Sequence, residues 1–204
     1  MSMRPLHFYF DFMSPFSYLA FAQLPEICER YGLELETHVV DLPKLKLLAG
    51  NTAPPNVSIP IKIRYLKTDL ERWAKRYQMP LVFPASLDTG ALNRAYLYAA
   101  DKRRPADFIR ETFDRLWAQG GDPADPALLA DLGSAFGWDP EELAAWTSSQ
   151  EAIVRLKADT QAASDAGVFG APTMVVDGQM WWGNDRLTFM REALGKGAEQ
   201  LRQS

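Results

Sequence analysis

His7-Phe8-Tyr9-Phe10-Asp11-Phe12-Met13-Ser14-Pro15-Phe16-Ser17 is the stretch of sequence that decides the fold. Its apolar run, rich in aromatic residues, predicts a buried strand from which the chain turns directly into a helix. Ser14 is a favoured N-cap residue, and Pro15 suits the first helical position because its missing N–H costs nothing there. We expect this helix to continue to about Tyr31, with an interruption at Pro25. The Ser14 hydroxyl would then lie where free backbone N–H groups favour an anion, and a plain capping role is the alternative.

Composition and charge exclude several classes of protein. The chain has 204 residues, of which 47% are hydrophobic, and a net charge of −4. This is enough apolar material for one large core or two coupled ones. No basic stripe is present, so we expect no nucleic-acid partner and no binding to a membrane surface. The first residues lack the apolar run of a signal peptide, and no stretch approaches the roughly 20 apolar residues of a membrane span.

Cysteine and histidine are rare in this chain. The single cysteine, Cys28, cannot form an internal disulfide, which favours a cytoplasmic location. Cys28 falls inside the first predicted helix, away from Ser14, and we expect it to be a small core residue. The two histidines, His7 and His38, each fall in a predicted strand. Neither has another histidine or cysteine nearby in the sequence, so we expect both to be structural and expect no metal site.

Hydrophobic patterns predict the order of the elements. Residues 6–12 and 33–42 have the pattern of strands, and with the helix between them they form a βαβ unit. Residues 43–62 contain glycine, asparagine and several prolines, and we expect an irregular loop there. Amphipathic helices follow. We expect them over about 63–77, 91–102 and 105–118, then from Asp125, from Asp139 and up to Gly167.

The last part of the chain returns to the pattern of strands. Asp177-Gly178 between two short apolar runs predicts a β-hairpin. Asn184 is a plausible N-cap for a final helix, which we expect to end at Gly195. The predicted order is therefore βαβ, several helices, and ββα.

This order, with Gly170-Ala171-Pro172-Thr173 just before the hairpin, resembles a thioredoxin fold with a large helical insertion. The resemblance implies an α/β protein with a thioredoxin-like, glutathione-binding domain over residues 1–42 and 150–204. Residues 43–149 would form the inserted all-helical domain. Redox members of this fold carry Cys-x-x-Cys where this chain has Ser14-Pro15-Phe16-Ser17, so dithiol exchange is chemically unavailable here.

Several further stretches are similar to the kappa-class glutathione transferase group, and within it to a branch of isomerases. The likeness covers essentially the whole chain, and the order and spacing of the stretches are more specific than any one motif. The stretches that carry it are 11–18, 50–51, 60–62, 65–74, 80–85, 170–173 and 180–187.

The resemblance implies an activity. It indicates a glutathione-dependent homodimer that acts on a small aromatic, pyruvate-type acid in naphthalene catabolism. The reaction would be a cis–trans isomerisation, in which a thiolate adds to a conjugated double bond, the resulting single bond rotates, and the thiolate leaves. A kappa-type transferase that acts on another electrophile is the alternative, and a glutathione-binding protein without catalysis is the second alternative.

The resemblance also implies the residues of the site. Ser14 would be the catalytic residue, because its hydroxyl can donate a hydrogen bond that favours the thiolate form of glutathione. Leu87 stands where the isomerase branch has a tyrosine, which leaves the exact substrate preference open. Phe12, Phe16 and Trp73 would form flat apolar walls. Besides Ser14, the implied glutathione contacts are Lys62, Ala171, Pro172, Trp182, Gly183, Asn184 and Asp185, and the implied substrate contacts are Lys46, Leu47, Asn56 and Leu87. Ordinary capping at Asn184 and a plain turn at Pro172 are the structural alternatives.

Overall fold

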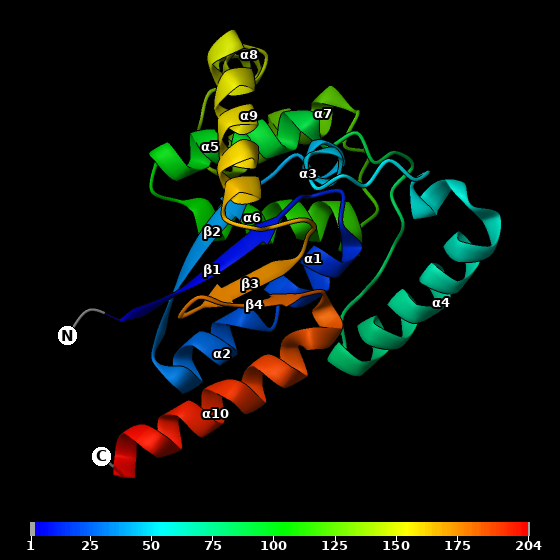
Figure 1. Ribbon diagram of the computed structural model, residues 1–204. Helices are drawn as coiled ribbons and strands as arrows, with labels where there is room; N and C mark the ends of the chain where they lie inside the picture. The colour runs from blue at the N-terminus through cyan, green and yellow to red at the C-terminus, as the bar shows by residue number, and fades with distance from the viewer. Residues whose placement is uncertain (1–2, 204) are drawn as a thin grey trace.

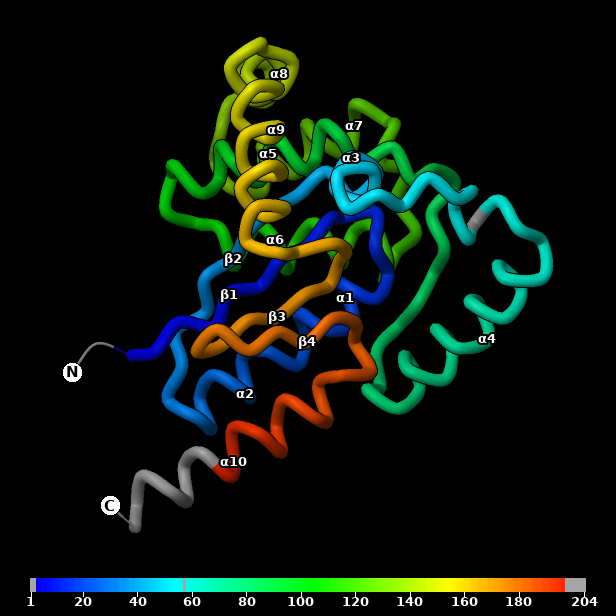
Figure 2. The backbone as a smooth tube through the Cα atoms, in the orientation of Figure 1, coloured from blue at the N-terminus to red at the C-terminus, as the bar shows by residue number. Residues whose placement is uncertain are grey.

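A four-stranded sheet lies at the centre of the protein. The computed structural model describes the backbone of residues 3–203 and the side chains of residues 3–56 and 58–196. The strand order is β2-β1-β3-β4, with β1 parallel to β2 and antiparallel to β3, and β3 antiparallel to β4. The strands are β1 (Arg4–Phe10), β2 (Leu33–Val39), β3 (Thr173–Val176) and β4 (Gln179–Trp182). Figure 2 shows that the chain leaves the sheet after β2 and returns to it only with β3.

Helices cover the sheet and make up most of the segment of chain between β2 and β3, which we call the excursion. Figure 1 shows α1, α2 and α10 below the sheet, α9 above it near β2, and α4 at the right edge of the molecule. The helices are α1 (Pro15–Phe21), α2 (Leu24–Tyr31), α3 (Leu42–Leu48), α4 (Pro60–Tyr77), α5 (Gly90–Asp101), α6 (Pro105–Phe113), α7 (Pro126–Ala135), α8 (Pro140–Thr147), α9 (Gln150–Asp165) and α10 (Leu187–Gln203). Short helical turns of other types are η1 (Asn56–Ser58), η2 (Asp114–Ala118) and η3 (Asn184–Arg186). The predicted α/β class and the βαβ and ββα ends are confirmed. None of the described helices is long and apolar enough to cross a membrane.

The sequence-based prediction of an irregular loop over residues 43–62 is wrong for its first part and for its last three residues, which belong to α4. Residues 42–48 form α3. Asp41 caps this helix, because its carboxylate accepts a hydrogen bond from the backbone N–H of Lys44 at 3.0 Å. Pro43 lies in the first turn, where its missing N–H is harmless.

Two further predictions concern where helices end. The interruption near Pro25 is confirmed, since α1 ends at Phe21 and α2 begins at Leu24. The predicted end of the last helix at Gly195 is wrong, because α10 continues to Gln203. Gly195 keeps a helical backbone there and does not adopt the left-handed conformation that ends a helix.

One continuous hydrophobic core joins the sheet to the helices of the excursion. Leu6, Phe8 and Phe10 of β1 are fully buried, and Phe10 packs edge-on against both Phe12 and Tyr96 of α5. Phe12 in turn lies 5.0 Å from Phe113 of α6, measured between ring centroids. Phe12 has no exposed surface, so the prediction that it forms a wall of a pocket is wrong. Aromatic packing between β1 and the excursion holds the end of β1 in place.

Candidate functional site

Ser14 lies at the end of the turn between β1 and α1, directly before the first residue of α1. Its side chain is buried, and its hydroxyl oxygen accepts a hydrogen bond from the backbone N–H of Ser17 at 3.2 Å. The predicted capping role is therefore confirmed. The same hydroxyl is 3.5 Å from the carbonyl oxygen of Ala171, to which it donates. The fold thus brings together two segments that are 157 positions apart in the sequence.

Asp11 is fully enclosed beneath this junction. Its carboxylate accepts hydrogen bonds from the backbone N–H groups of Met13 and Leu42 and from the hydroxyl of Thr89, each at 2.9 Å. Burial raises the pKa of Asp11, and these donors together with Asn93 counteract part of the rise. These contacts engage both carboxylate oxygens, so Asp11 ties β1 to the starts of α3 and α5, and nothing suggests that it acts as a base for Ser14.

The segment that faces Ser14 has a special backbone. The peptide bond between Ala171 and Pro172 is cis, and the carbonyl of Pro172 accepts a hydrogen bond from the N–H of Gly183 at 2.9 Å. Trp182 packs directly over Gly170, where an added Cβ would lie only 2.5 Å from the indole nitrogen. Trp182 is half exposed, whereas the neighbouring Trp181 packs against the core. Trp182 is therefore the member of the tryptophan pair that can meet a ligand.

Asn184 is buried, and the hydrogen-bonding atoms of its side-chain amide are left unsatisfied. It is 2% exposed, and neither its side-chain oxygen nor its nitrogen makes a hydrogen bond of good geometry with the described residues. The phenol of Tyr77 faces this amide, and the contact counteracts part of the rise in the pKa of Tyr77 that burial causes. The predicted N-cap role is wrong, because Asn184 lies inside η3 and its side chain caps no N–H. A buried amide in this state is available to a ligand.

Asp185 and Gly183 complete this corner of the site. Asp185 is exposed and pairs with Arg186 at 2.7 Å. Gly183 has a φ of +100°, and an added Cβ would lie 2.6 Å from a carboxylate oxygen of Asp185. A side chain at position 183 would therefore displace that carboxylate.

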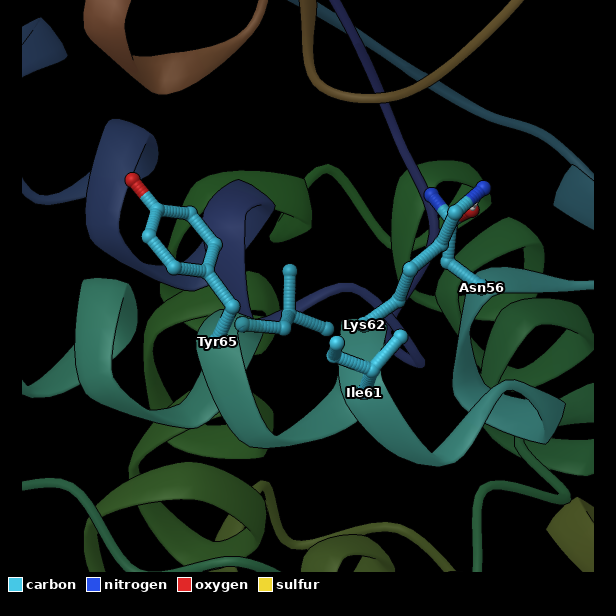
Figure 3. Close-up of a pocket in the computed structure, with 5 residues that line it drawn as sticks. Asn56, Ile61, Lys62 and Tyr65 are labelled. Atoms are coloured by element: carbon cyan, nitrogen blue, oxygen red, sulfur yellow. Dashed lines mark hydrogen bonds between the residues drawn. The ribbon is translucent and has the colours of Figure 1, made fainter.

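A hollow of about 380 Å³ lies beside the amino-terminal end of α4. Figure 3 shows Asn56, Lys62 and Tyr65 around it, and the Lys62 amine donates to the side-chain oxygen of Asn56 at 3.2 Å. Ile61 and Leu66 are the other lining residues. The structure thus joins one predicted glutathione contact and one predicted substrate contact in a single hollow. α4 also packs against α1, the helix that Ser14 caps.

The remaining predicted substrate residues lie on separate elements. Half-buried Lys46 and exposed Leu47 belong to α3. Leu87 packs against the core from the coil between α4 and α5. Among the described residues, no hydrogen bond or ion pair joins Lys46 to Ser14 or to Lys62, and the roles of these side chains stay predictions.

Cys28 offers no nucleophile to this site. Burial raises the pKa of its thiol to about 11, so the thiolate is scarce at neutral pH. It packs against the core, as predicted.

Sequence reasoning missed Tyr77 and Thr89 as partners of the site, because the contacts depend on how helices pack. A second group of polar side chains, which includes both histidines, lies on the sheet itself.

Comparisons with known proteins agree with this geometry. The DSBA-like thioredoxin domain matches residues 5–195. The fold and the position of Ser14 opposite a cis-proline therefore define a protein of the DSBA-like thioredoxin class.

The likeness to individual proteins is more specific. The chain is 39% identical over 193 residues to the 2-hydroxychromene-2-carboxylate isomerase of Pseudomonas putida, covering 95% of each chain. A solved structure of a 2-hydroxychromene-2-carboxylate isomerase superposes with a TM-score of 0.91 and 38% identity, covering 98% of each chain. Human glutathione S-transferase kappa 1 is 27% identical over 209 residues, covering 95% of this chain and 92% of that protein. The chain belongs to the family of the 2-hydroxychromene-2-carboxylate isomerases, which are enzymes of the isomerase class, and the predicted resemblance is confirmed.

Proposed function

We propose that this protein catalyses the glutathione-dependent cis–trans isomerisation of 2-hydroxychromene-2-carboxylate to trans-o-hydroxybenzylidenepyruvate. The observation that carries the proposal is the buried Ser14 hydroxyl opposite the cis Ala171–Pro172 bond, in a chain whose own thiol is held protonated. The names of the isomerase relatives support the substrate. The name of the human kappa-class relative supports glutathione.

Glutathione would be held by residues of η3, β4 and α4, and both η3 and α4 pack against α1. The unsatisfied amide of Asn184 can hold the γ-glutamyl carboxylate, and the exposed carboxylate of Asp185 suits the ammonium group beside it. The backbone of Ala171 and Pro172 would bind the cysteinyl part, with Trp182 and Gly183 bordering it. Lys62, at the start of α4, would meet a carboxylate of glutathione or of the substrate.

Ser14 would act by donating its hydroxyl proton to the sulfur as a hydrogen bond. Bound glutathione supplies a thiolate that adds to the conjugated double bond and leaves after the resulting single bond has rotated, so nothing is consumed. A hydrogen bond to a charged acceptor contributes about 1.5–3 kcal/mol. That corresponds to about one to two pKa units on the thiol. The hydroxyl would exchange its long contact with Ala171 for this stronger one.

Lys46, Leu47, Asn56 and Leu87 are proposed substrate contacts. A carboxylate in a mostly apolar site needs a cation or several donors, which Lys46 and the Lys62–Asn56 pair can provide. Leu87 would add apolar surface. Phe16 and Trp73, both partly buried, are proposed as the flat walls.

A kappa-type glutathione transferase is the second candidate function, favoured by the likeness to the human kappa-class enzyme. The same thiolate would attack another electrophile, and the conjugate would leave. Loss of free glutathione during turnover distinguishes this reaction from isomerisation, in which the concentration of glutathione stays constant.

We also propose the context in which the enzyme works. Its substrate class places it in the catabolism of naphthalene and related aromatic compounds, and its single cysteine suits the cytoplasm. We propose a homodimer without nucleic-acid or membrane partners. Light scattering from the purified protein tests the dimer, and a mass of one chain would contradict it.

The decisive assay follows the absorbance of 2-hydroxychromene-2-carboxylate with the purified protein and glutathione. We expect isomerisation that requires glutathione and leaves its concentration unchanged. S-methylglutathione is the matched control, because it keeps the tripeptide backbone but has no free thiol, and it should inhibit without supporting turnover. Equal rates with and without glutathione, or no isomerisation at all, would contradict the proposal.

A further inference from the structure

Both histidines of the chain lie in one cluster on the sheet. The sequence contains two histidines, His7 in β1 and His38 in β2. In the parallel register, His7 lies opposite Glu36, and His38 follows Glu36 by two positions on the same strand. Because side chains alternate between the faces of a strand, Glu36 and His38 share one face. The sheet therefore gathers three potential ligands that are distributed over 32 positions of the sequence.

The distances within this His7–Glu36–His38 cluster suit a metal ion. Nδ1 of His7 is 3.1 Å from Nε2 of His38 and 3.2 Å from a carboxylate oxygen of Glu36. All three ligand atoms lie within 4.8 Å of one another. Two ligands of a tetrahedral zinc ion, each about 2.0–2.1 Å from the metal, are about 3.3 Å apart. Two of the three distances between ligand atoms are thus close to the spacing that the ion would impose, and the third, between Glu36 and His38, is within 4.8 Å.

His38 is packed against a neighbouring ring and borders a cavity. The ring of Tyr9 stacks on His38 with 4.7 Å between centroids, and both histidines are partly buried. His38 also lines a cavity of about 340 Å³ whose lining includes none of the residues proposed to bind glutathione. The cluster is therefore separate from the Ser14 site.

We propose that His7, Glu36 and His38 form a binding site for one divalent transition-metal ion, with zinc as the best match. Imidazole nitrogen is a borderline ligand and carboxylate oxygen a harder one, and zinc binds both kinds. Three protein ligands leave a fourth position for water or another ligand. Without the ion, Nδ1 of His7 lies within hydrogen-bonding distance of both Nε2 of His38 and the Glu36 carboxylate.

Zinc titration of the untagged full-length protein by calorimetry tests the site. We expect one ion per chain. Removal of an outer partner of a metal ligand already weakens binding about 10- to 100-fold, so His38→Asn should weaken it by more than about 100-fold. Glu34→Gln is the matched control, because Glu34 is exposed on the same strand and lies outside the cluster. Unchanged affinity in His38→Asn, an equal loss in Glu34→Gln, or no saturable binding would overturn the proposal.

A second measurement needs no variant. Since the chain has two histidines, its imidazole NMR signals belong to this cluster. Added zinc should shift both sets of signals together and reach completion at one equivalent. A shift of one imidazole alone, or of neither, would overturn the proposal even where His38→Asn fails to fold.

Discussion

Ser14 and Asp11 lie three positions apart, yet their side chains have different tasks. The Ser14 hydroxyl faces the opposite segment and is free to turn toward a ligand, because its contact with Ala171 is long at 3.5 Å. The Asp11 carboxylate is held by three donors at 2.9 Å and binds the surrounding elements together. The first side chain would act in the reaction, and the second would position it.

Replacement of Ser14 by alanine should distinguish the proposed role of its hydroxyl in turnover from its role as a helix cap. Ser149 caps α9, because its hydroxyl oxygen accepts a hydrogen bond from the backbone N–H of Ala152 at 3.2 Å, the same length as the bond that Ser14 accepts from Ser17. Ser14→Ala and Ser149→Ala should therefore each lower the free energy of unfolding by about 1 kcal/mol. Ser14→Ala alone should lower turnover by about 10- to 100-fold and raise the pKa of the bound thiol by about one to two units.

The pH–rate profile and the ultraviolet absorbance of the thiolate measure this effect. An unchanged thiol pKa in Ser14→Ala would show that the hydroxyl does not bind the sulfur. Equal losses of activity in Ser14→Ala and Ser149→Ala would show that only stability is affected.

Asp11→Asn should reveal the cost of ionising a buried carboxyl group. Burial raises the pKa of Asp11 above its ordinary value of 3.8, so the folded state holds the proton more tightly than the unfolded state. As the pH rises from about 3.8 to the folded-state pKa, the wild type should lose stability relative to Asp11→Asn, by at most about 1.4 kcal/mol per pH unit. Urea denaturation at a series of pH values measures this difference. A difference that grows in favour of the wild type with rising pH would contradict the assignment.

At the scale of elements, two glycines have opposite environments. Gly170 lies beneath the Trp182 indole, whereas nothing lies within 4 Å of a Cβ added at Gly195 inside α10. Gly170→Ala should displace Trp182 and lower the free energy of unfolding by about 1–3 kcal/mol. Gly195→Ala should raise it by about 0.5–1 kcal/mol, because alanine loses less backbone entropy in a helix.

Chemical denaturation and glutathione affinity distinguish the two variants. Only Gly170→Ala should weaken binding of the tripeptide, since its displaced indole borders the proposed site. Full affinity in a Gly170→Ala protein would argue against Trp182 as a glutathione contact.

The sequence predicted those elements whose signals are local. The strand–turn–helix around Ser14 and the hairpin at Asp177-Gly178 follow from short patterns, and both are confirmed. Asp41 and Pro43 are ordinary residues for a helix start, yet α3 is not predicted. The glycine and prolines that follow make the composition of the whole segment typical of a loop. Asn184 was expected to cap a helix, and only tertiary packing shows it to be buried with an unsatisfied amide.

Contacts between distant segments could not be predicted in this way. The alternation along each strand placed His7 and His38 in strands, yet it did not give the register that brings them within 3.1 Å. The network around Asp11 likewise depends on where α3 and α5 begin relative to β1. The contact between Ser14 and Ala171 could be anticipated only through the resemblance to a known fold.

At the scale of the whole molecule, the sheet and the helices of the excursion share one core. Phe12 of the β1–α1 junction packs against Phe113, and its carbonyl accepts a hydrogen bond from the Trp117 indole at 2.8 Å. The backbone N–H of Phe12 donates to Asn93 in α5. These buried contacts leave neither part with a complete core of its own.

Unfolding should therefore be a single cooperative transition. Far-ultraviolet circular dichroism, which follows the helices, and tryptophan fluorescence, which follows packing, should give coincident urea curves. The proposed division into a thioredoxin-like domain and an inserted helical domain would then describe chain topology and not independent stability. Two separate transitions would show that the inserted part folds by itself.

The placement of β1 between β2 and β3 also has a consequence for how the protein is made. β2 emerges from the ribosome soon after β1, but the segment that faces Ser14 follows 157 positions later. At about 5–20 residues per second, translation leaves one edge of β1 without its neighbour for roughly 8–31 s. During that interval the nascent chain presents unpaired backbone groups beside its most aromatic segment, and release of the final hairpin closes that edge.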